Sequence, residues 1–189
     1  MLYKKTGPDM TLRSHDIIAI FNELFLAQEN TQLCGGLEEP LYQPSGKGPA
    51  TIGFRHDFCR SALHEVAHWC LAGRARREVE DYGYWYTPDD RCELQQAAFF
   101  RVEVKPQALE AIFCEAVGLQ FRVSLDNLSS AIAKDSVDTF STEVDAAKTR
   151  FMAQGLPRRA RLFYEALKRH ATSQVPQQPA AFHVELKAS

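Results

Sequence analysis

The sequence predicts an α+β fold, with one mostly helical domain and a small β-sheet. Apolar residues recur at helical spacing over most of the chain, and one aromatic, β-prone segment interrupts them. No internal repeat and no linker divides the 189 residues, a length that can bury a hydrophobic core without disulfides. We therefore expect a single domain over residues 1–189, with a core at about 12–168 and a flexible tail at about 171–189.

Five helices are expected where apolar residues repeat every three or four positions. They lie at about 14–25, 55–71, 90–117 and 140–152, and a last one starts at 156–157. Ser14 or Asp16 can cap the first helix, while Gly73 and Gly118 can end the second and third. Pro106 must kink the third helix or start a new one, because it lacks a backbone N–H.

Three other segments lack helical spacing. Residues 34–50 contain four glycines and three prolines and predict a loop, with a short extended piece at 41–42. Residues 79–86 carry three tyrosines and a tryptophan, and they predict the strand of the small sheet. Residues 119–145 are weakly patterned up to the helix expected near 140.

Composition and charge exclude several classes of protein. The formal net charge is −2, so no overall field attracts the chain to nucleic acid or to an anionic membrane. The N-terminus lacks the apolar region of a signal peptide, and no apolar run approaches the roughly 20 residues that span a bilayer. The five cysteines form no C-x-x-C pair and most have apolar neighbours, which is typical of reduced thiols in a cytoplasmic protein.

The most specific motif is H-E-x-x-H at residues 64–68. His64 and His68 lie one turn apart on the same face of a helix, so both can bind one metal ion. Glu65 can direct its carboxylate at a metal-bound water molecule. On a helical wheel the apolar residues from Phe58 to Cys70 form one arc, and both histidines lie on the side away from the core. Two histidines and one carboxylate would leave open coordination positions, which is typical of a catalytic site.

A third metal ligand must come from another segment. The acidic candidates are Glu80, Asp81, Glu103, Glu110 and Glu115. We favour Glu103, because it lies on the next predicted helix, four residues before Gln107 and close to Pro106. Glu115 is the reserve candidate. The sequence thus predicts a metal helix packed beside a second, ligand-bearing helix.

Two further groups of residues suit a substrate or a partner. Tyr82, Tyr84 and Tyr86 would share one side of a strand, where they form either sheet surface or, together with Asp81, a groove for a cationic chain. The basic cluster of Arg74, Arg76 and Arg77 is either solvated surface or a docking patch for an acidic partner.

These motifs together resemble the bacterial elongation factor P hydroxylase family. The resemblance rests on SALHEVAHWCLAG at 61–73 and on segments at 76–78, 81–86, 102–109, 126–128 and 155–161, in collinear order between about 12 and 168. H-E-x-x-H alone is shared with many metalloproteases. Its combination with the following W-C and with Y-G-Y-W-Y is specific.

The resemblance implies a monooxygenase that hydroxylates a lysine of elongation factor P once that lysine carries a β-lysyl group. It also implies Fe(II) as the metal and O₂ as co-substrate, with His64, His68 and, by carry-over, Glu103 as ligands. This ligand set suits Fe(II) that activates O₂, and hydroxylation of an unactivated C–H bond requires such a metal because side chains cannot supply the chemistry. Glu65 would then contact bound water or the lysyl amine, and the basic cluster would meet an acidic surface of the partner.

Two alternatives use the same motif differently. In a zinc-dependent metallopeptidase, Glu65 would be the general base that activates a zinc-bound water. In a non-catalytic binding module, the metal would be structural, and replacing His64 by alanine would unfold the protein. Peptide cleavage that is lost on replacing Glu65 by glutamine would favour the peptidase.

Overall fold

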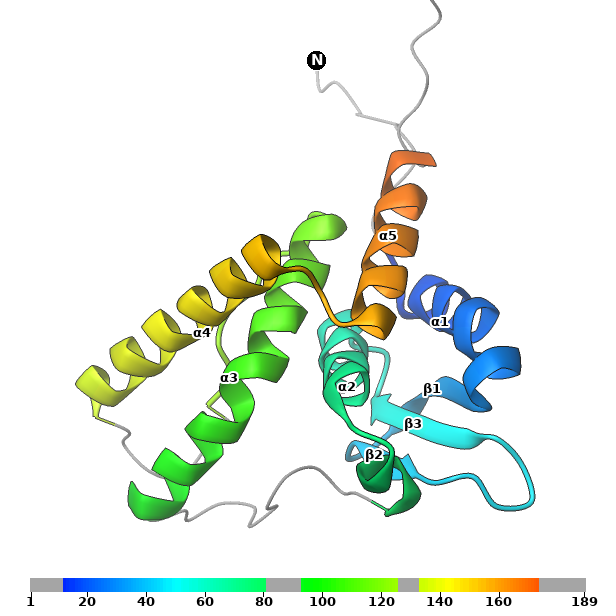
Figure 1. Ribbon diagram of the computed structural model, residues 1–189, viewed down its shortest axis with the longest axis horizontal. Coiled ribbons are helices and arrows are strands. Elements are labelled where there is room, and N and C mark those ends of the chain that lie inside the picture. The colour runs from blue at the N-terminus through cyan, green and yellow to red at the C-terminus, as the bar shows by residue number, and fades with distance from the viewer. Residues whose placement is uncertain (1–11, 81–92, 126–132, 174–189) are drawn as a thin grey trace, which may run out of the picture.

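The computed structural model describes residues 12–80, 93–125 and 133–173. Within these ranges, five α-helices and a short 3₁₀ helix accompany a three-stranded sheet (Figure 1), which confirms the predicted fold class. In chain order the elements are α1 (Ser14–Glu29), β1 (Thr31–Leu37), β2 (Leu41–Gln43), β3 (Ala50–Arg55), α2 (Cys59–Leu71), η1 (Ala75–Glu78), α3 (Glu93–Ala116), α4 (Lys134–Gln154) and α5 (Arg158–Ser173). None of the helices in the described part of the chain combines the length and apolar character that a membrane span requires.

Helix α1 is capped by Arg13, so the expected capping role of Ser14 is wrong. The carboxylate of Asp16 accepts the backbone N–H of Arg13 at 3.0 Å. Asp16 therefore stabilises the helix start from inside the first turn, where unpaired N–H groups carry partial positive charge.

The observed sheet precedes the metal helix in the chain. Strand β3 is central and pairs in parallel with β1 and antiparallel with β2. The extended piece predicted at 41–42 is confirmed as β2, whereas the loop predicted at 34–50 is wrong at its two ends, because β1 continues to Leu37 and β3 begins at Ala50. The helix predicted from Arg55 is also too long, since that residue ends β3 and α2 starts at Cys59. Of the strand predicted at 79–86, Val79 and Glu80 lie outside any strand and the rest lies outside the described residues.

The glycines that suggested a loop allow close packing within the sheet instead. A Cβ atom on Gly35 would lie 2.7 Å from the ring of Phe54, and one on Gly53 would clash with Leu37. Gly36 has a φ of 88° and lies where β1 shifts its register against β3. Glycine enrichment in this segment therefore reflects a bulged strand and its tight contacts.

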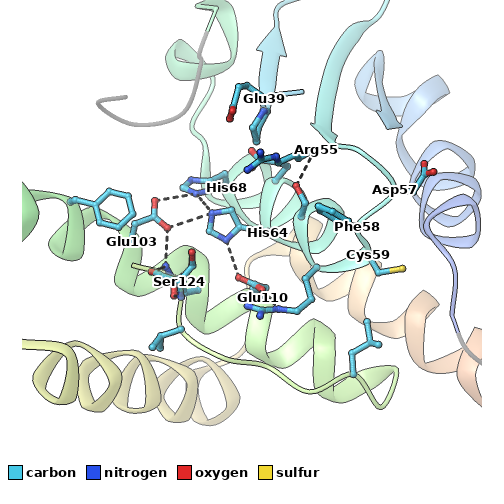
Figure 2. Close-up of a pocket in the computed structure, with 18 residues that line it drawn as sticks. Glu39, Arg55, Asp57, Phe58, Cys59, His64, His68, Glu103, Glu110 and Ser124 are labelled. Atoms are coloured by element: carbon cyan, nitrogen blue, oxygen red, sulfur yellow. Dashed lines mark hydrogen bonds and ion pairs between the residues drawn. The ribbon is translucent and has the colours of Figure 1, made fainter. Parts of the chain in front are cut away.

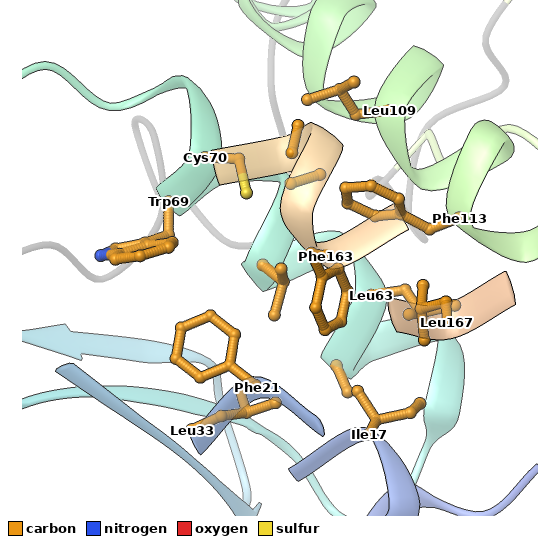
Figure 3. Close-up of a cluster of buried hydrophobic side chains, with 14 of the residues drawn as sticks. Ile17, Phe21, Leu33, Leu63, Trp69, Cys70, Leu109, Phe113, Phe163 and Leu167 are labelled. Atoms are coloured by element: carbon orange, nitrogen blue, oxygen red, sulfur yellow. The ribbon is translucent and has the colours of Figure 1, made fainter. Parts of the chain in front are cut away.

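Helix α2 lies in the middle of the molecule (Figure 1) and buries one side in the core. Its buried residues are Ala62, Leu63, Val66, Ala67, Trp69 and Cys70. Figure 3 shows Trp69 and Cys70 among side chains of α1, α3 and α5, and the Trp69 ring lies 5.0 Å from that of Phe21. The placement of Phe58 in the apolar arc is wrong: it precedes the helix as its N-cap, with extended backbone, and is 57% exposed.

Helix α3 runs without a break from Glu93 to Ala116, so Pro106 does not start a new helix. Gly118 follows its end with a φ of 70°, as expected for a helix stop. Helix α5 begins directly after Pro157, as predicted, and extends to Ser173, past the expected start of the tail; the rest of that tail lies outside the described residues.

Helix α4 is longer than the segment predicted at 140–152. It starts at Lys134, but its buried residues are Phe140, Val144 and Ala147. Residues 134–136 are polar and exposed, so no apolar residue marks the start of the helix.

Helix α3 separates two hydrophobic clusters. The larger one joins α1, α2, α5, the sheet and the second half of α3, including Leu109 and Phe113. The smaller one joins Phe99 and Phe100 of α3 to Phe140 and Val144 of α4. Packing on both sides fixes α3 beside α2, and the polar side chains between these two helices form the site.

Candidate metal centre

Two helices bring the predicted ligands together, as Figure 2 shows. His64 and His68 lie on successive turns of α2, and their Nε2 atoms are 3.0 Å apart. Glu103 faces them from α3, with one carboxylate oxygen 3.2 Å from His68 Nε2 and the other 3.5 Å from His64 Nε2. One donor atom from each of the three residues lies within 4.8 Å of the others.

The donor set fits a single divalent cation. Donor atoms that each lie about 2.0–2.2 Å from one ion are roughly 3–3.5 Å apart, which matches the observed spacing. The Glu103 side chain is 4% exposed, whereas those of His64 and His68 are 22% and 20% exposed, so the cluster is closed toward α3 and accessible from one side. Imidazole nitrogen and carboxylate oxygen are ligands for zinc or iron, and three of them leave coordination positions open.

The other acidic candidates lie elsewhere. Glu115 is exposed and binds Lys148 at 2.8 Å, and Glu80 is exposed and absent from the cluster. Asp81 lies outside the described residues. Among the described residues, therefore, Glu103 is the carboxylate that joins the two histidines.

Glu110 supports His64 from behind. It accepts a hydrogen bond from His64 Nδ1 at 2.9 Å, and its other oxygen binds Arg60 Nε and Nη2 at 3.0 and 2.8 Å. The Glu110 side chain is 2% exposed, and its buried charge is compensated by the guanidinium of Arg60, whose side chain is 38% exposed. A hydrogen bond of this kind fixes the ring orientation and leaves Nε2 of His64 free to bind a cation.

Gln107 performs a similar task next to Glu103. Its side-chain Nε2 lies 3.5 Å from a Glu103 oxygen and donates to the carbonyl of Ser124 at 2.8 Å, while its Oε1 accepts the Ser124 N–H at 2.9 Å. Glu103, Gln107 and Glu110 are four and three residues apart, so they form one face of α3. This spacing indicates that Glu110 faces the same way as Glu103, whereas its role in supporting His64 follows from the packing of α2 against α3.

The cluster has strongly perturbed protonation equilibria. Burial disfavours the charged imidazole of His64, but the hydrogen bond to Glu110 and the surrounding carboxylates outweigh it and raise the pKa of His64 to about 10. Burial also disfavours the carboxylate of Glu103, but the charge and hydrogen bond of His68 lower the pKa of Glu103 to about 2. The site therefore attracts positive charge, and a bound cation would replace a proton.

A pocket of about 710 Å³ opens over the cluster. Its described wall comes from the β1–β2 connection, the start of α2, the polar face of α3 and residues 119–124. Glu65 lines it beside the two histidines, and Phe58 and Glu39 lie among its more exposed residues. This volume is within the usual range for sites that enclose a small molecule or a long side chain.

The remaining predicted residues fall into three groups. Tyr82, Tyr84, Tyr86 and Asp81 lie outside the described residues. Arg74 is exposed and pairs with Glu78 at 3.2 Å, whereas Arg77 is 24% exposed and binds Glu29 at 3.1 Å. Arg76 and Arg77 both line a second cavity, which adjoins the pocket over the cluster.

The cysteines of the described residues are reduced and take no part in the cluster. Cys70 and Cys114 are buried and Cys34 and Cys59 are partly buried, all four as free thiols. Burial raises the pKa of Cys114 to about 12, so this thiol stays protonated at neutral pH.

Comparison with known proteins identifies relatives over most of the chain. The model of the family described as elongation factor P hydroxylase matches residues 20–182. The chain is also similar to the elongation factor P lysine hydroxylase of Haemophilus influenzae, with 43% identity over 160 residues, which cover 84% of this chain and 89% of that protein. The matched range includes both helices that form the cluster.

Proposed function

The chain belongs to the elongation factor P hydroxylase family, and we propose that it hydroxylates a lysine side chain of elongation factor P in a metal-dependent reaction. The observation that carries the metal dependence is the cluster of His64, His68 and Glu103 beneath an accessible pocket. We further propose that the substrate is the lysine that already carries a β-lysyl group, and that the metal is Fe(II).

The bound Fe(II) would supply the activation of O₂ that C–H hydroxylation requires. In the balanced reaction one oxygen atom enters a C–H bond of the lysine side chain and the other leaves as water. A two-electron reductant, as a further co-substrate, supplies the two electrons, and two protons are consumed. His64, His68 and Glu103 would hold the ion, and Glu110 would keep His64 oriented.

The charge of the pocket suits a cationic substrate arm. Glu39, Asp57 and Glu65 line it, and their carboxylates would attract the ammonium groups of a lysyl-lysine side chain. The exposed ring of Phe58 offers an apolar and cation–π surface for the same arm. Glu65, next to the ligand His64, would hold the lysyl amine or a proton of a bound water molecule.

The proposal also assigns roles to two groups of residues that the sequence analysis identified. Tyr82, Tyr84 and Tyr86, with Asp81, would contact the lysyl arm. Arg74 and Arg76 would contact an acidic surface of elongation factor P, whereas Arg77 serves mainly the protein's own packing through Glu29.

A zinc peptidase is the second candidate, and one observation favours it. A glutamate from the following helix beside H-E-x-x-H is also the ligand set of zinc peptidases, in which Glu65 would be the general base. The same purified protein can be tested for both activities.

The experiment incubates the protein, loaded with Fe(II), with a reductant and ¹⁸O₂, and with β-lysylated or unmodified elongation factor P. We expect the β-lysylated protein to gain the mass of one labelled oxygen atom and the unmodified protein to gain less or none. The His68→Ala variant is the matched control. No mass gain by the metal-loaded protein would contradict the hydroxylase, and zinc-dependent cleavage of peptides that Glu65→Gln abolishes would establish the alternative.

A further inference from the structure

A second cavity, of about 370 Å³, adjoins the metal-centre pocket. Glu65 and His68 line both cavities, so the two meet at the metal helix. Part of the second wall is apolar or aromatic and comes from Ile52 of β3, Trp69 of α2 and Val102 of α3. Its volume is in the range of small-molecule sites.

Positive side chains dominate the lining of this cavity. Arg76 and Arg77 of η1 and Arg101 and Lys105 of α3 all contribute, and Glu65 is the acidic residue in the described lining. We call this the basic cavity. Arg77 is already neutralised by Glu29 at 3.1 Å.

The charges of Arg101 and Lys105 have no partner among the described residues. They lie one turn apart on α3, both are exposed, and neither side chain forms an ion pair or a hydrogen bond with the described part of the chain. Two unpaired cations at the edge of a concave, partly apolar cavity form a site for an anion with an apolar body.

The neighbouring pocket has the opposite charge. Its described lining includes five carboxylates against two arginines: Glu39, Asp57, Glu65, Glu103 and Glu110, and Arg55 and Arg60. The α2 helix thus separates a space that suits a cation from a space that suits an anion.

We propose that the basic cavity binds a small molecule with a carboxylate group. The carboxylate lies between Arg101 and Lys105, and the body of the molecule packs against Trp69 and Ile52. The concave shape and the volume favour a small ligand over an acidic protein surface, which would need a flatter and wider patch. The proposal does not depend on the hydroxylase activity.

Calorimetric titration of the full chain tests this proposal, with succinate as the probe and its uncharged diamide as the control ligand. We expect succinate to bind and the diamide not to bind. Arg101→Gln/Lys105→Gln should weaken succinate binding by about tenfold or more, since hydrogen bonds between charged groups are lost. The matched control is Arg161→Gln/Lys168→Gln, which removes two exposed cations of α5 that line neither cavity.

Thermal unfolding of both double variants verifies that each is folded during the titration. The proposal is overturned if the diamide binds as well as succinate, or if both double variants bind succinate as the unmodified chain does. It is also overturned if millimolar succinate gives no binding, and in that case Arg101→Gln/Lys105→Gln is tested for weaker binding of elongation factor P. If that binding is weaker, the cations would serve a protein interface.

Discussion

Two arginines contact the two ends of α2 in opposite ways. Arg60 belongs to the first turn of the helix, and its guanidinium binds Glu110 of α3 at 2.8 and 3.0 Å. Arg159 comes from α5 and donates to the carbonyl oxygens of Trp69, Cys70 and Ala72 at the other end. Its guanidinium also lies 4.5 Å from the ring of Trp69.

The helix dipole explains what the difference means. The last carbonyls of a helix lack partners and carry partial negative charge, so Arg159 lies where a cation stabilises α2. Arg60 lies near the positive end, where a cation is unfavourable unless an anion compensates it. Glu110 is that anion, and it also orients His64. Arg159 therefore stabilises the C-terminal end of α2. At the N-terminal end, the unfavourable charge of Arg60 is compensated by Glu110, which in turn orients His64.

The largest effect is expected from removing a candidate metal ligand, His68, which lies in the last turn of α2. In His68→Ala the cluster loses one of three ligands, so hydroxylation of elongation factor P should fall to background. The free energy of unfolding of the metal-free protein should change by less than about 1 kcal/mol, because the side chain is on the pocket side of α2. Product mass and denaturant unfolding measure the two quantities. Global unfolding of the variant would instead indicate a structural metal.

The next largest effect is expected at the carbonyl groups that end α2. Arg159→Ala removes the donor to three carbonyl oxygens and a contact with Trp69, and it should lower the free energy of unfolding by about 2–4 kcal/mol. Arg158→Ala is the matched control, since this side chain is 67% exposed and pairs with Glu29 at 3.3 Å; it should cost less than about 1 kcal/mol. Equal losses for both variants, measured by urea unfolding, would contradict the role of Arg159.

A smaller effect, on metal affinity, is expected when Glu110 is replaced. Glu110→Gln keeps the shape of the side chain but removes the charge that orients His64, and it should weaken metal binding by about 10- to 100-fold. Glu115→Gln changes a carboxylate of the same helix that is 69% exposed and pairs with Lys148, so metal affinity should stay the same. Competition with a chromophoric chelator measures both. Unchanged affinity in Glu110→Gln would show that the pair with His64 is not needed.

The most gradual effect is a dependence of metal affinity and of stability on pH. Because the pKa of His64 is raised to about 10 in the metal-free protein, metal binding must displace its proton. Affinity should therefore rise by up to about tenfold per pH unit between about pH 7 and 9. The raised pKa contributes stability that is fully present below the unfolded value of 6.5 and is lost toward pH 10, so the metal-free protein should become less stable as pH rises. The pH dependence of metal affinity and that of the free energy of unfolding should both persist in Arg159→Ala and weaken in Glu110→Gln. The same pH dependence in the two variants would contradict the assignment of these effects to His64.

The cluster of three candidate ligands could be predicted from the sequence in part because helical spacing is local information. His64 and His68 share a face by their separation of four, and Glu103 is the acidic residue nearest to Pro106 on the next helix. The support of His64 by Glu110 could not be predicted in the same way. It depends on how α2 and α3 pack, which brings together residues 46 positions apart.

The predicted sheet differs more from the structure than the predicted metal cluster does, because strand pairing also depends on non-local contacts. Strands β1 and β3 pair in parallel across a connection that includes β2, and this pairing is non-local. Gly35 and Gly53 look like loop residues in the sequence, but they are required by neighbours that the sequence does not place beside them. The start of α4 is not predicted, because its first residues are polar and helical periodicity detects apolar residues that are buried.

Residues 122–124 belong to no helix or strand, yet three of their backbone groups are bonded by side chains that support the metal cluster. Arg60 donates to the carbonyl of Arg122, and Gln107 pairs with both the N–H and the C=O of Ser124. These side chains form the hydrogen bonds that the backbone of a neighbouring strand would otherwise provide. The resistance of this segment to local opening therefore depends on Arg60 and Gln107, and the exchange rate of the Ser124 amide hydrogen would report whether the side chains that support the candidate cluster are in place.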